Sequence, residues 1–300
     1  MSLIIVKALL NATNLSNWNP TFPLQLGNEQ AGHRPWQGIV SEVSISSRAI
    51  SETEVADVFS NEGLLPSMNS SLVALYKLQG RKDHYRDMAG HLPDLSWQGN
   101  FSDTQEGMGI LLTSSHWLET KGPATLLTQK LRETSQFTLN VTAATAEPPR
   151  TQLASIISLS GTKFHRNFTL GQQENALVFG LRTPITGIYG KDPILFIPNI
   201  FVNTNPHHII ITYDGLEIRF YIDRLQNLYS LKLNPEIAIF RYLSLPLNVW
   251  WINLKAPNTA FYKILFYGLI FVPLGSLIAF IVAISTKKYF IFLPKEDPHF

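Results

Sequence analysis

The stretch that decides the fold is His208-Ile-Ile-Ile-Thr-Tyr-Asp-Gly-Leu-Glu-Ile-Arg-Phe-Tyr-Ile-Asp223. Its first half is an apolar run that ends in Asp214-Gly215, a dipeptide that favours the tight turn of a β-hairpin. In the second half Ile218, Phe220 and Ile222 occupy every second position, so they share one face of an extended strand. The stretch therefore predicts two antiparallel strands joined by a short turn.

The same period of two recurs along the chain. Residues 135–142 place Phe137, Leu139 and Val141 on one side of a strand and three polar residues on the other, which predicts a strand with one buried face. Shorter strand candidates are residues 72–78, 110–113, 153–159, 176–182 and 228–233. Many short strands separated by turn residues predict a mainly β chain, an antiparallel β-sandwich of the jelly-roll type.

One helix is expected within this β-rich region. Ser51-Glu-Thr-Glu54 is a capping box, in which the serine hydroxyl and the glutamate carboxylate satisfy backbone N–H groups at the start of a helix. Val55, Val58 and Phe59 then form an apolar stripe that we expect to pack into the core. Gly63 is the expected end of the helix, and residues 66–71 are expected to form a linker.

A second helix is expected near the C-terminus. Residues 264–286 carry no charged side chain, and an uncharged helix of about 20 residues spans the hydrocarbon core of a bilayer. We therefore predict one transmembrane helix over about 264–286, with the membrane as a partner. Lys287 and Lys288 favour a cytoplasmic C-terminal tail, which predicts an extracytoplasmic β-sandwich.

Composition excludes several kinds of protein. A net charge of +2 without a basic run predicts no nucleic-acid partner. The chain has no cysteine, which excludes disulfides, thiolate metal sites and cysteine nucleophiles. Charged residues make up 15% of the chain, fewer than the quarter or so that is typical of soluble proteins, in agreement with a membrane segment.

Several motifs together resemble the laminin-G-like (concanavalin A-like) jelly roll. Three runs resemble the closing part of that fold: Leu24-Gln-Leu-Gly-Asn-Glu29, Arg34-Pro-Trp-Gln-Gly38 and the run from Val43 to Val55. Its opening resembles Leu72–Leu78 with Asp87-Met-Ala-Gly90, and its central strand pair resembles Ile211–Gly215 with Phe220–Asp223. The usual glycine of the second hairpin is missing, because Asp223 is followed by Arg224.

The order of these motifs is unusual, since the closing part precedes the opening. We assign residues 1–66 to the closing part of a laminin-G-like jelly roll, 71–245 to a laminin-G-like β-sandwich and 246–300 to a membrane anchor. Residues 1–66 are either the remnant of an upstream domain or a part of one composite sandwich in permuted order. The composite sandwich is favoured, because the termini of sandwiches lie close together.

A second resemblance concerns the membrane anchor. Residues 240–252 and 266–275 are similar to the start of a VanZ-like membrane domain. Of the residue pattern on the second helix of that family, only Phe271, Pro273 and Gly275 are present. This resemblance implies a truncated VanZ-like segment, and it leaves open that the chain is a fragment of a VanZ-like protein without independent activity.

Catalytic chemistry is not expected from the sequence. Jelly-roll glycan hydrolases need two carboxylates close together, often as E-x-D-x-x-E, and no such string occurs. Glu42 stands alone, and Glu217 and Asp223 lie about 20 Å apart on one extended strand at roughly 3.3 Å per residue. His207 and His208 point to opposite faces of a strand, so they cannot bind one metal ion together. A glycan hydrolase remains an alternative.

The expected role is therefore recognition, by a non-catalytic, membrane-anchored module that binds a glycan or a surface protein. Aromatic residues that could stack on sugar rings are Trp36, Trp97, Trp117 and Tyr189. Laminin-G-like domains often bind calcium, and that resemblance makes Asp87, with Asp83 nearby, the candidate metal ligands.

Overall fold

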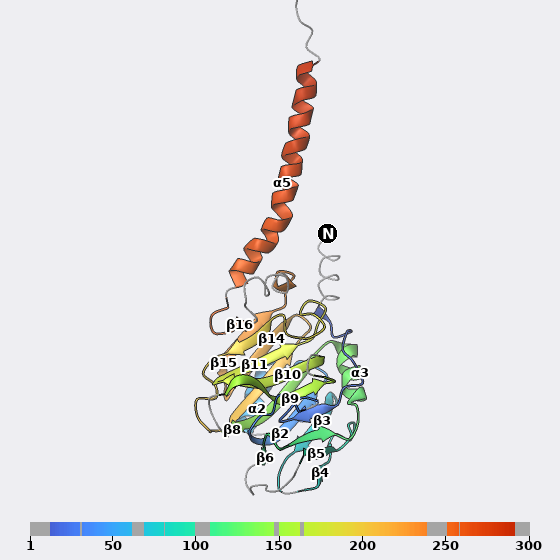
Figure 1. The fold of residues 1–300 in the computed structure, drawn as a ribbon, viewed down its shortest axis with the longest axis vertical. Helices are drawn as coiled ribbons and strands as arrows, with labels where there is room; N and C mark the ends of the chain where they lie inside the picture. The colour runs from blue at the N-terminus through green and yellow to red at the C-terminus, as the bar shows by residue number, and fades with distance from the viewer. Residues whose placement is uncertain are drawn as a thin grey trace, which may run out of the picture. The chain divides into compact units, whose positions relative to one another are not determined.

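The computed structural model describes residues 13–30, 32–61, 69–80, 82–99, 109–146, 150–162, 165–238, 251–257 and 259–291. The chain divides into two compact units, one that ends at Pro257 and one that begins at Asn258. The first unit is rich in β-structure and the second contains a single long helix (Figure 1).

Two sheets build the first unit. Sheet A has nine strands in the order β16 (Trp251–Asn253), β12 (Ile194–Ile197), β11 (Ala176–Leu181), β10 (Arg166–Glu174), β9 (Arg150–Ser160), β1 (Leu24–Leu26), β7 (His116–Thr120), β5 (Leu95–Gly99) and β4 (His84–Tyr85). Sheet B contains β15 (Arg224–Lys232), β14 (Glu217–Ile222), β13 (His207–Tyr213), β8 (Phe137–Thr145), β2 (Gly38–Ser46) and β3 (Leu72–Lys77), with β6 (Ile110–Leu112) paired to β2. All described pairs are antiparallel except that of β12 with β16.

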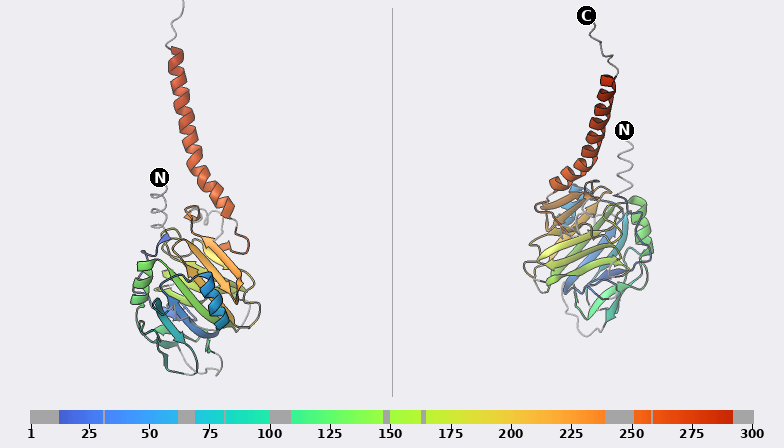
Figure 2. Two further views of the ribbon diagram at one scale, coloured as in Figure 1. Left: turned by 180° about the vertical axis from the view of Figure 1, so that it is seen from behind. Right: turned by 45° about the horizontal axis from the view of Figure 1, so that its top comes forward.

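Aromatic side chains from both sheets meet in the core. Phe137 of sheet B lies 6.5 Å, between ring centroids, from Phe179 of sheet A, and Phe220 of sheet B lies 5.6 Å from the same ring. Tyr213 and Phe168 extend this cluster within sheets B and A. Because large apolar side chains lose water contact here, the two sheets pack face to face as a sandwich, whose layers are visible in Figure 2.

The predicted hairpin is confirmed as β13 and β14. Ile211 pairs with Phe220, and Gly215 takes a positive φ of 92° in the turn. The Asp214 carboxylate accepts hydrogen bonds from the backbone N–H groups of Leu216 and Glu217, at 2.9 and 2.8 Å. The shorter strand candidates are also confirmed, as β3, β6, β9, β11 and β15.

Asp223 occupies the turn where the laminin-G-like pattern has glycine. Its φ is 64°, a left-handed conformation that asparagine and aspartate adopt more readily than most residues. Its carboxylate accepts from the backbone N–H of His208 at 2.9 Å and lies 2.8 Å from His207 Nδ1. These contacts hold the left-handed turn without a glycine.

The prediction that β8 buries only one face is wrong. Thr138 and Asn140, expected to face water, are 1% and 5% exposed. Helix α2 (Glu52–Asn61) covers this outer face of sheet B, where Val55 and Val58 pack with Ile210 and Tyr221. The Thr138 hydroxyl donates to the Arg48 carbonyl at 2.7 Å, so this polar side chain keeps a hydrogen bond although it is buried.

The capping box of α2 is confirmed. The Glu54 backbone N–H donates to Ser51 Oγ at 3.3 Å, and the Ser51 N–H donates to Glu54 Oε2 at 3.0 Å. Glu54 also receives two hydrogen bonds from the Arg48 guanidinium, the shorter at 2.6 Å. Gly63 and Pro66 lie outside the described residues.

Another helix, α3 (Thr125–Thr134), was not expected from the sequence. It buries Leu127 and Leu131, and it ends at Ser135, whose φ is 53°. The Ser135 N–H donates to the Leu131 carbonyl at 2.8 Å, which closes the helix with a left-handed cap.

Strands β1 and β2 lie inside the two sheets. β1 pairs with β9 on one side and β7 on the other, and β2 pairs with β8 and β3. Residues 24–46 are therefore built into a sandwich whose other strands come later in the chain, and both belong to the unit that ends at Pro257.

The second unit contains helix α5 (Thr259–Ile291). Its segment Ala260–Ser285 has 26 residues and is long and apolar enough to cross a membrane, since it extends about 39 Å at 1.5 Å per residue. None of this segment is buried by protein; Val272 and Phe280, for example, are 68% and 64% exposed. Phe271, Pro273 and Gly275 all lie within α5, whereas residues 240–250 of the VanZ-like resemblance lie outside the described residues.

Candidate functional site

A polar patch lies on the outer face of sheet A, where β5 and β7 pair. Leu118 of β7 is fully buried, so the alternating side chains of Trp117 and Glu119 point away from the core. Ser96 of β5 pairs with Glu119, and Gln98 pairs with Trp117, so all four side chains share this face. We call Ser96, Gln98, Trp117 and Glu119 the Trp117 patch.

The patch is one end of a polar row that crosses sheet A. The register aligns Ser96, Glu119, Gln25, Ser158, Thr169 and Gly180 from six neighbouring strands. Gln25 links the row, because its Nε2 donates to Glu119 Oε2 at 3.4 Å and its Oε1 accepts from Ser158 Oγ at 2.8 Å. The row is half-buried at Ser96 and Glu119 and fully buried from Gln25 onward.

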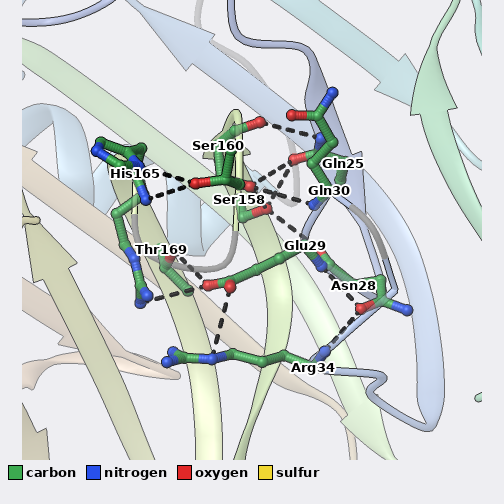
Figure 3. A network of polar contacts seen from close by, with 11 residues as sticks. Gln25, Asn28, Glu29, Gln30, Arg34, Ser158, Ser160, His165 and Thr169 are labelled. Atoms are coloured by element: carbon green, nitrogen blue, oxygen red, sulfur yellow. Dashed lines mark hydrogen bonds and ion pairs between the residues drawn. The ribbon is translucent and has the colours of Figure 1, made fainter.

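Loop residues 28–36 cover the buried half of the row. Figure 3 shows Asn28, Glu29, Gln30 and Arg34 of this loop close to Gln25 and Ser158, and the Ser158 Oγ donates to the Asn28 carbonyl at 3.0 Å. The Asn28 side-chain oxygen accepts from the backbone N–H groups of Glu29 and Arg34, at 2.9 and 3.0 Å. These two bonds fix the orientation of the Asn28 amide, so its Nδ2 is the atom that remains to donate.

Polar atoms without a protein partner border the patch. Among the residues that the structure describes, Trp117 Nε1, Ser96 Oγ and Asn28 Nδ2 are buried and have no hydrogen-bond partner. A Cβ atom at Gly32 would lie 3.5 Å from the Trp117 ring and 4.0 Å from Asn28 Nδ2, so this loop glycine passes beside both. Buried polar groups of native proteins are almost always satisfied, so water or a bound molecule is needed to supply partners for these three atoms.

The carboxyl of Glu119 is electrostatically perturbed. Burial raises its pKa above the ordinary value, and the hydrogen bond from Gln25 offsets part of this shift. A half-buried carboxyl with a raised pKa beside an indole ring can accept hydrogen bonds from hydroxyl groups while the ring packs against C–H faces.

A buried ion cluster lies beneath the same loop. Glu29 is fully buried; its Oε1 lies 3.3 Å from Arg166 Nη1 and its Oε2 lies 3.5 Å from Arg34 Nε. Thr169 Oγ1 also donates to Glu29 Oε1, at 3.4 Å. Burial, together with repulsion from Arg34, lowers the pKa of Arg166 to about 10 despite the attraction of Glu29.

The four aromatic residues proposed as sugar contacts lie in different environments. Trp36 is fully buried and its Nε1 donates to Gln172 Oε1 at 2.9 Å, so its ring is core and is not accessible to a ligand. Trp97 is half-buried on the opposite face of sheet A from Trp117, and its Nε1 donates to the Lys82 carbonyl at 2.9 Å. Tyr189 lies in the loop after β11, with its ring centroid 5.6 Å from that of His165. Trp117 alone of the four belongs to the polar patch.

Asp87 holds a turn together. Its Oδ1 accepts from the backbone N–H groups of Leu75 and Ala89, and its Oδ2 accepts from those of His91 and Leu92, at 2.8 to 3.0 Å. Asp83 is exposed. Among the described residues no group of three or more histidine, aspartate and glutamate side chains is arranged for a metal ion. Calcium binding at Asp83 and Asp87 stays a prediction.

The other carboxylates and histidines have local partners. Glu42 pairs across strands with Lys77, and Glu217 contacts Arg219. His207 faces Phe201 and Asp223, whereas His208 lies against Phe59 and Asn140, so the two rings do point to opposite faces. Glu29 lies between Arg34 and Arg166.

Sequence reasoning missed most of this site. The alternation in residues 116–120 is a signal that places Trp117 and Glu119 together, but the pairing of Glu119 with Ser96 and of Trp117 with Gln98 depends on strand register. The approach of Glu29 to Arg166 has no local signal, because it depends on loop 28–36 folding across β9 and β10. In comparisons with known proteins, no family model, no curated protein and no solved structure matches this chain.

Proposed function

We propose that the chain is a non-catalytic recognition module, tethered to a membrane by α5, that binds a glycan at the Trp117 patch. One observation carries the proposal: the Trp117 indole and the Glu119 carboxylate share an outer sheet face. The Trp117 Nε1, the neighbouring Ser96 Oγ and Asn28 Nδ2 of the adjoining loop are buried without a hydrogen-bond partner within the described structure. Sugars offer the complementary groups, C–H faces for the ring and hydroxyls for the polar atoms.

Helix α5 is the proposed membrane anchor. A helix of this length with apolar, uncovered side chains is stable when lipid surrounds it. Lys287 and Lys288 follow the span and favour the cytoplasmic side, so the sandwich is proposed to be extracytoplasmic. The two-sheet architecture is compatible with the laminin-G-like jelly roll that the motifs resemble, and that assignment is part of the proposal.

Binding of the full-length chain in detergent micelles to a glycan array tests the proposal. We expect a restricted set of glycans to bind, and Trp117→Ala to weaken binding about 10-fold or more, as the loss of a central aromatic anchor does. Trp251→Ala is the matched control, because Trp251 is 48% exposed on the edge strand β16 and outside the patch.

Two results would count against glycan recognition at this patch. One is an absence of binding to every glycan. The other is equal weakening by Trp117→Ala and Trp251→Ala. Capture of a surface protein that survives Trp117→Ala would instead support protein recognition elsewhere on the molecule.

A further inference from the structure

An apolar patch lies at the edge of sheet A that precedes α5 in the chain. Among the described strands, the edge strand β16 pairs with β12 alone, and Trp251 of β16 is opposite Ile194 of β12. Leu195 and Ile197 of β12 are buried in the core. The alternating side chains of Ile194 and Phe196 therefore share the outer face of the sheet with Trp251. We call Ile194, Phe196 and Trp251 the Trp251 edge.

Protein covers this edge only in part. Trp251 is 48% exposed, although its ring centroid lies 6.3 Å from that of Phe196. Ile194 and Phe196 are half-buried. Exposed aromatic side chains on an edge strand favour association with another apolar surface, so the Trp251 edge is suited to a partner that accepts a ring.

A cation and a second aromatic ring adjoin this edge. Lys255 is exposed, and its Nζ lies 6.0 Å from the centroid of the half-buried Tyr229 ring. An ammonium group has three N–H donors, so a contact with one ring face leaves donors for an anion such as a phosphate. Tryptophan, tyrosine and lysine are the residues that favour the membrane–water interface, where rings meet acyl chains and polar tips meet headgroups.

The covalent connection to α5 identifies that interface as the partner. Trp251 precedes Ala260, the first residue of the membrane-length segment, by nine positions, and Lys255 precedes it by five. Even fully extended, nine residues span at most about 32 Å and five at most about 18 Å. Because headgroups lie directly outside the hydrocarbon core, the Trp251 edge stays within reach of them whenever α5 spans the bilayer.

We propose that the Trp251 edge docks on the headgroup region of the bilayer that α5 spans, with the Trp251 ring among the upper acyl chains and Lys255 at lipid phosphates. This proposal rests on the proposed membrane anchor. Strand β7, which carries Trp117, is the sixth strand from β16 in sheet A. At about 4.8 Å per strand, the Trp117 patch is about 29 Å along the sheet from the docked edge, so docking leaves it open to a glycan.

Fluorescence quenching of the full-length chain in vesicles tests the docking, with lipids that are brominated in the upper part of their acyl chains. The emission of Trp251 is the difference between the wild type and Trp251→Phe, and we expect brominated lipid to remove most of it. Trp117→Phe is the matched control, because Trp117 also lies on the outer face of sheet A. The emission that this control removes should be the same in brominated and ordinary vesicles.

A second variant keeps the Trp251 ring in place. Lys255→Glu changes an exposed side chain, and the new carboxylate should be repelled by lipid phosphates and reduce the quenching of Trp251. Quenching that is unchanged in Lys255→Glu would contradict the phosphate contact.

The anchor is checked separately. The chain has no cysteine, so Ile278→Cys creates a single labelling site within α5. An environment-sensitive fluorophore at this site should report hydrocarbon. If it does and the Trp251 emission escapes quenching, the docking is wrong and the anchor stands. If the fluorophore reports water, the anchor and the docking are both wrong.

Discussion

At the residue scale, Asp87 shows how one side chain can take a role that its motif leaves open. The same D-x-x-G turn suits a calcium ligand and a structural aspartate. The structure gives Asp87 four backbone donors and an exposure of 2%. A carboxylate used by four N–H groups binds the turn 87–92 to β3 by charge-assisted hydrogen bonds.

Asp87→Asn is expected to lower the free energy of unfolding by about 3 kcal/mol, because an amide nitrogen cannot accept from backbone N–H groups. Urea unfolding followed by tryptophan fluorescence measures this loss. Asp83→Asn, at an exposed neighbour, should change the free energy of unfolding by less than about 0.5 kcal/mol. Equal effects of the two substitutions would show that the four bonds contribute little.

Glu119 makes the free energy of unfolding depend on pH, and the sign of this dependence follows from its raised pKa. Burial disfavours the ionised carboxyl in the folded state, so the folded pKa lies above the ordinary value of 4.5. The proton contributes stability below pH 4.5, and this contribution is lost as the pH rises through the folded pKa.

The free energy of unfolding of the wild type should therefore fall relative to that of Glu119→Gln as the pH rises above 4.5. Comparing the two proteins cancels the contribution of Glu42, whose pKa burial also raises. Urea unfolding at a series of pH values between 4 and 8 measures the difference. A constant difference over that range would show that Glu119 is not desolvated.

At the scale of elements, α2 explains why the outer face of sheet B can carry threonine, asparagine and serine without contact with water. The helix buries Ile210 and Tyr221 beneath Val55 and Val58, and the segment before the helix hydrogen-bonds Thr138 through the Arg48 carbonyl and the Ile50 N–H. The position of the helix over the sheet therefore depends on how its first turn is capped.

Ser51→Ala removes the acceptor for the Glu54 N–H and should reduce the free energy of unfolding by about 1 kcal/mol. Ser60→Ala is the matched control within the same helix, because its hydroxyl is exposed and bonds only back to the Ala56 carbonyl among the contacts described. Chemical denaturation of both variants tests the difference. A loss at Ser60 as large as that at Ser51 would argue against the cap.

At the scale of the whole molecule, the decisive feature is that β1 and β2 are interior strands. Each pairs on both sides with strands from later in the chain, so the sheets are split without them. The remaining strands would then expose unpaired edges and the core surface that Leu24, Leu26, Val43 and Ile45 of β1 and β2 cover in the complete molecule.

A chain of residues 69–300 is therefore expected to be misfolded, and co-expression of residues 1–66 should restore a folded, two-piece sandwich. Near-UV circular dichroism and co-purification of the pieces measure the recovery. A natively folded 69–300 chain would contradict this expectation and would support an independent second domain.

How far the sequence predicts this molecule depends on the range of the interactions. Three features depend only on residues that are neighbours in the sequence, and the sequence predicts each of them: the hairpin at Asp214-Gly215, the capping box at Ser51 and the uncharged run of α5. Their signals are local because turn geometry, helix capping and lipid solubility act within a few residues or along one continuous segment.

Register and burial depend on distant partners. The sequence alone determined that the chain is mainly β with one membrane-length helix, because side-chain periodicity and hydrophobic length need no partner. Only the tertiary structure decided that Trp36 is core while Trp117 faces outward beside Glu119, and that Glu29 meets Arg166. The reason is that strand pairing and loop packing join residues far apart in the chain, and only the folded molecule specifies which of them meet.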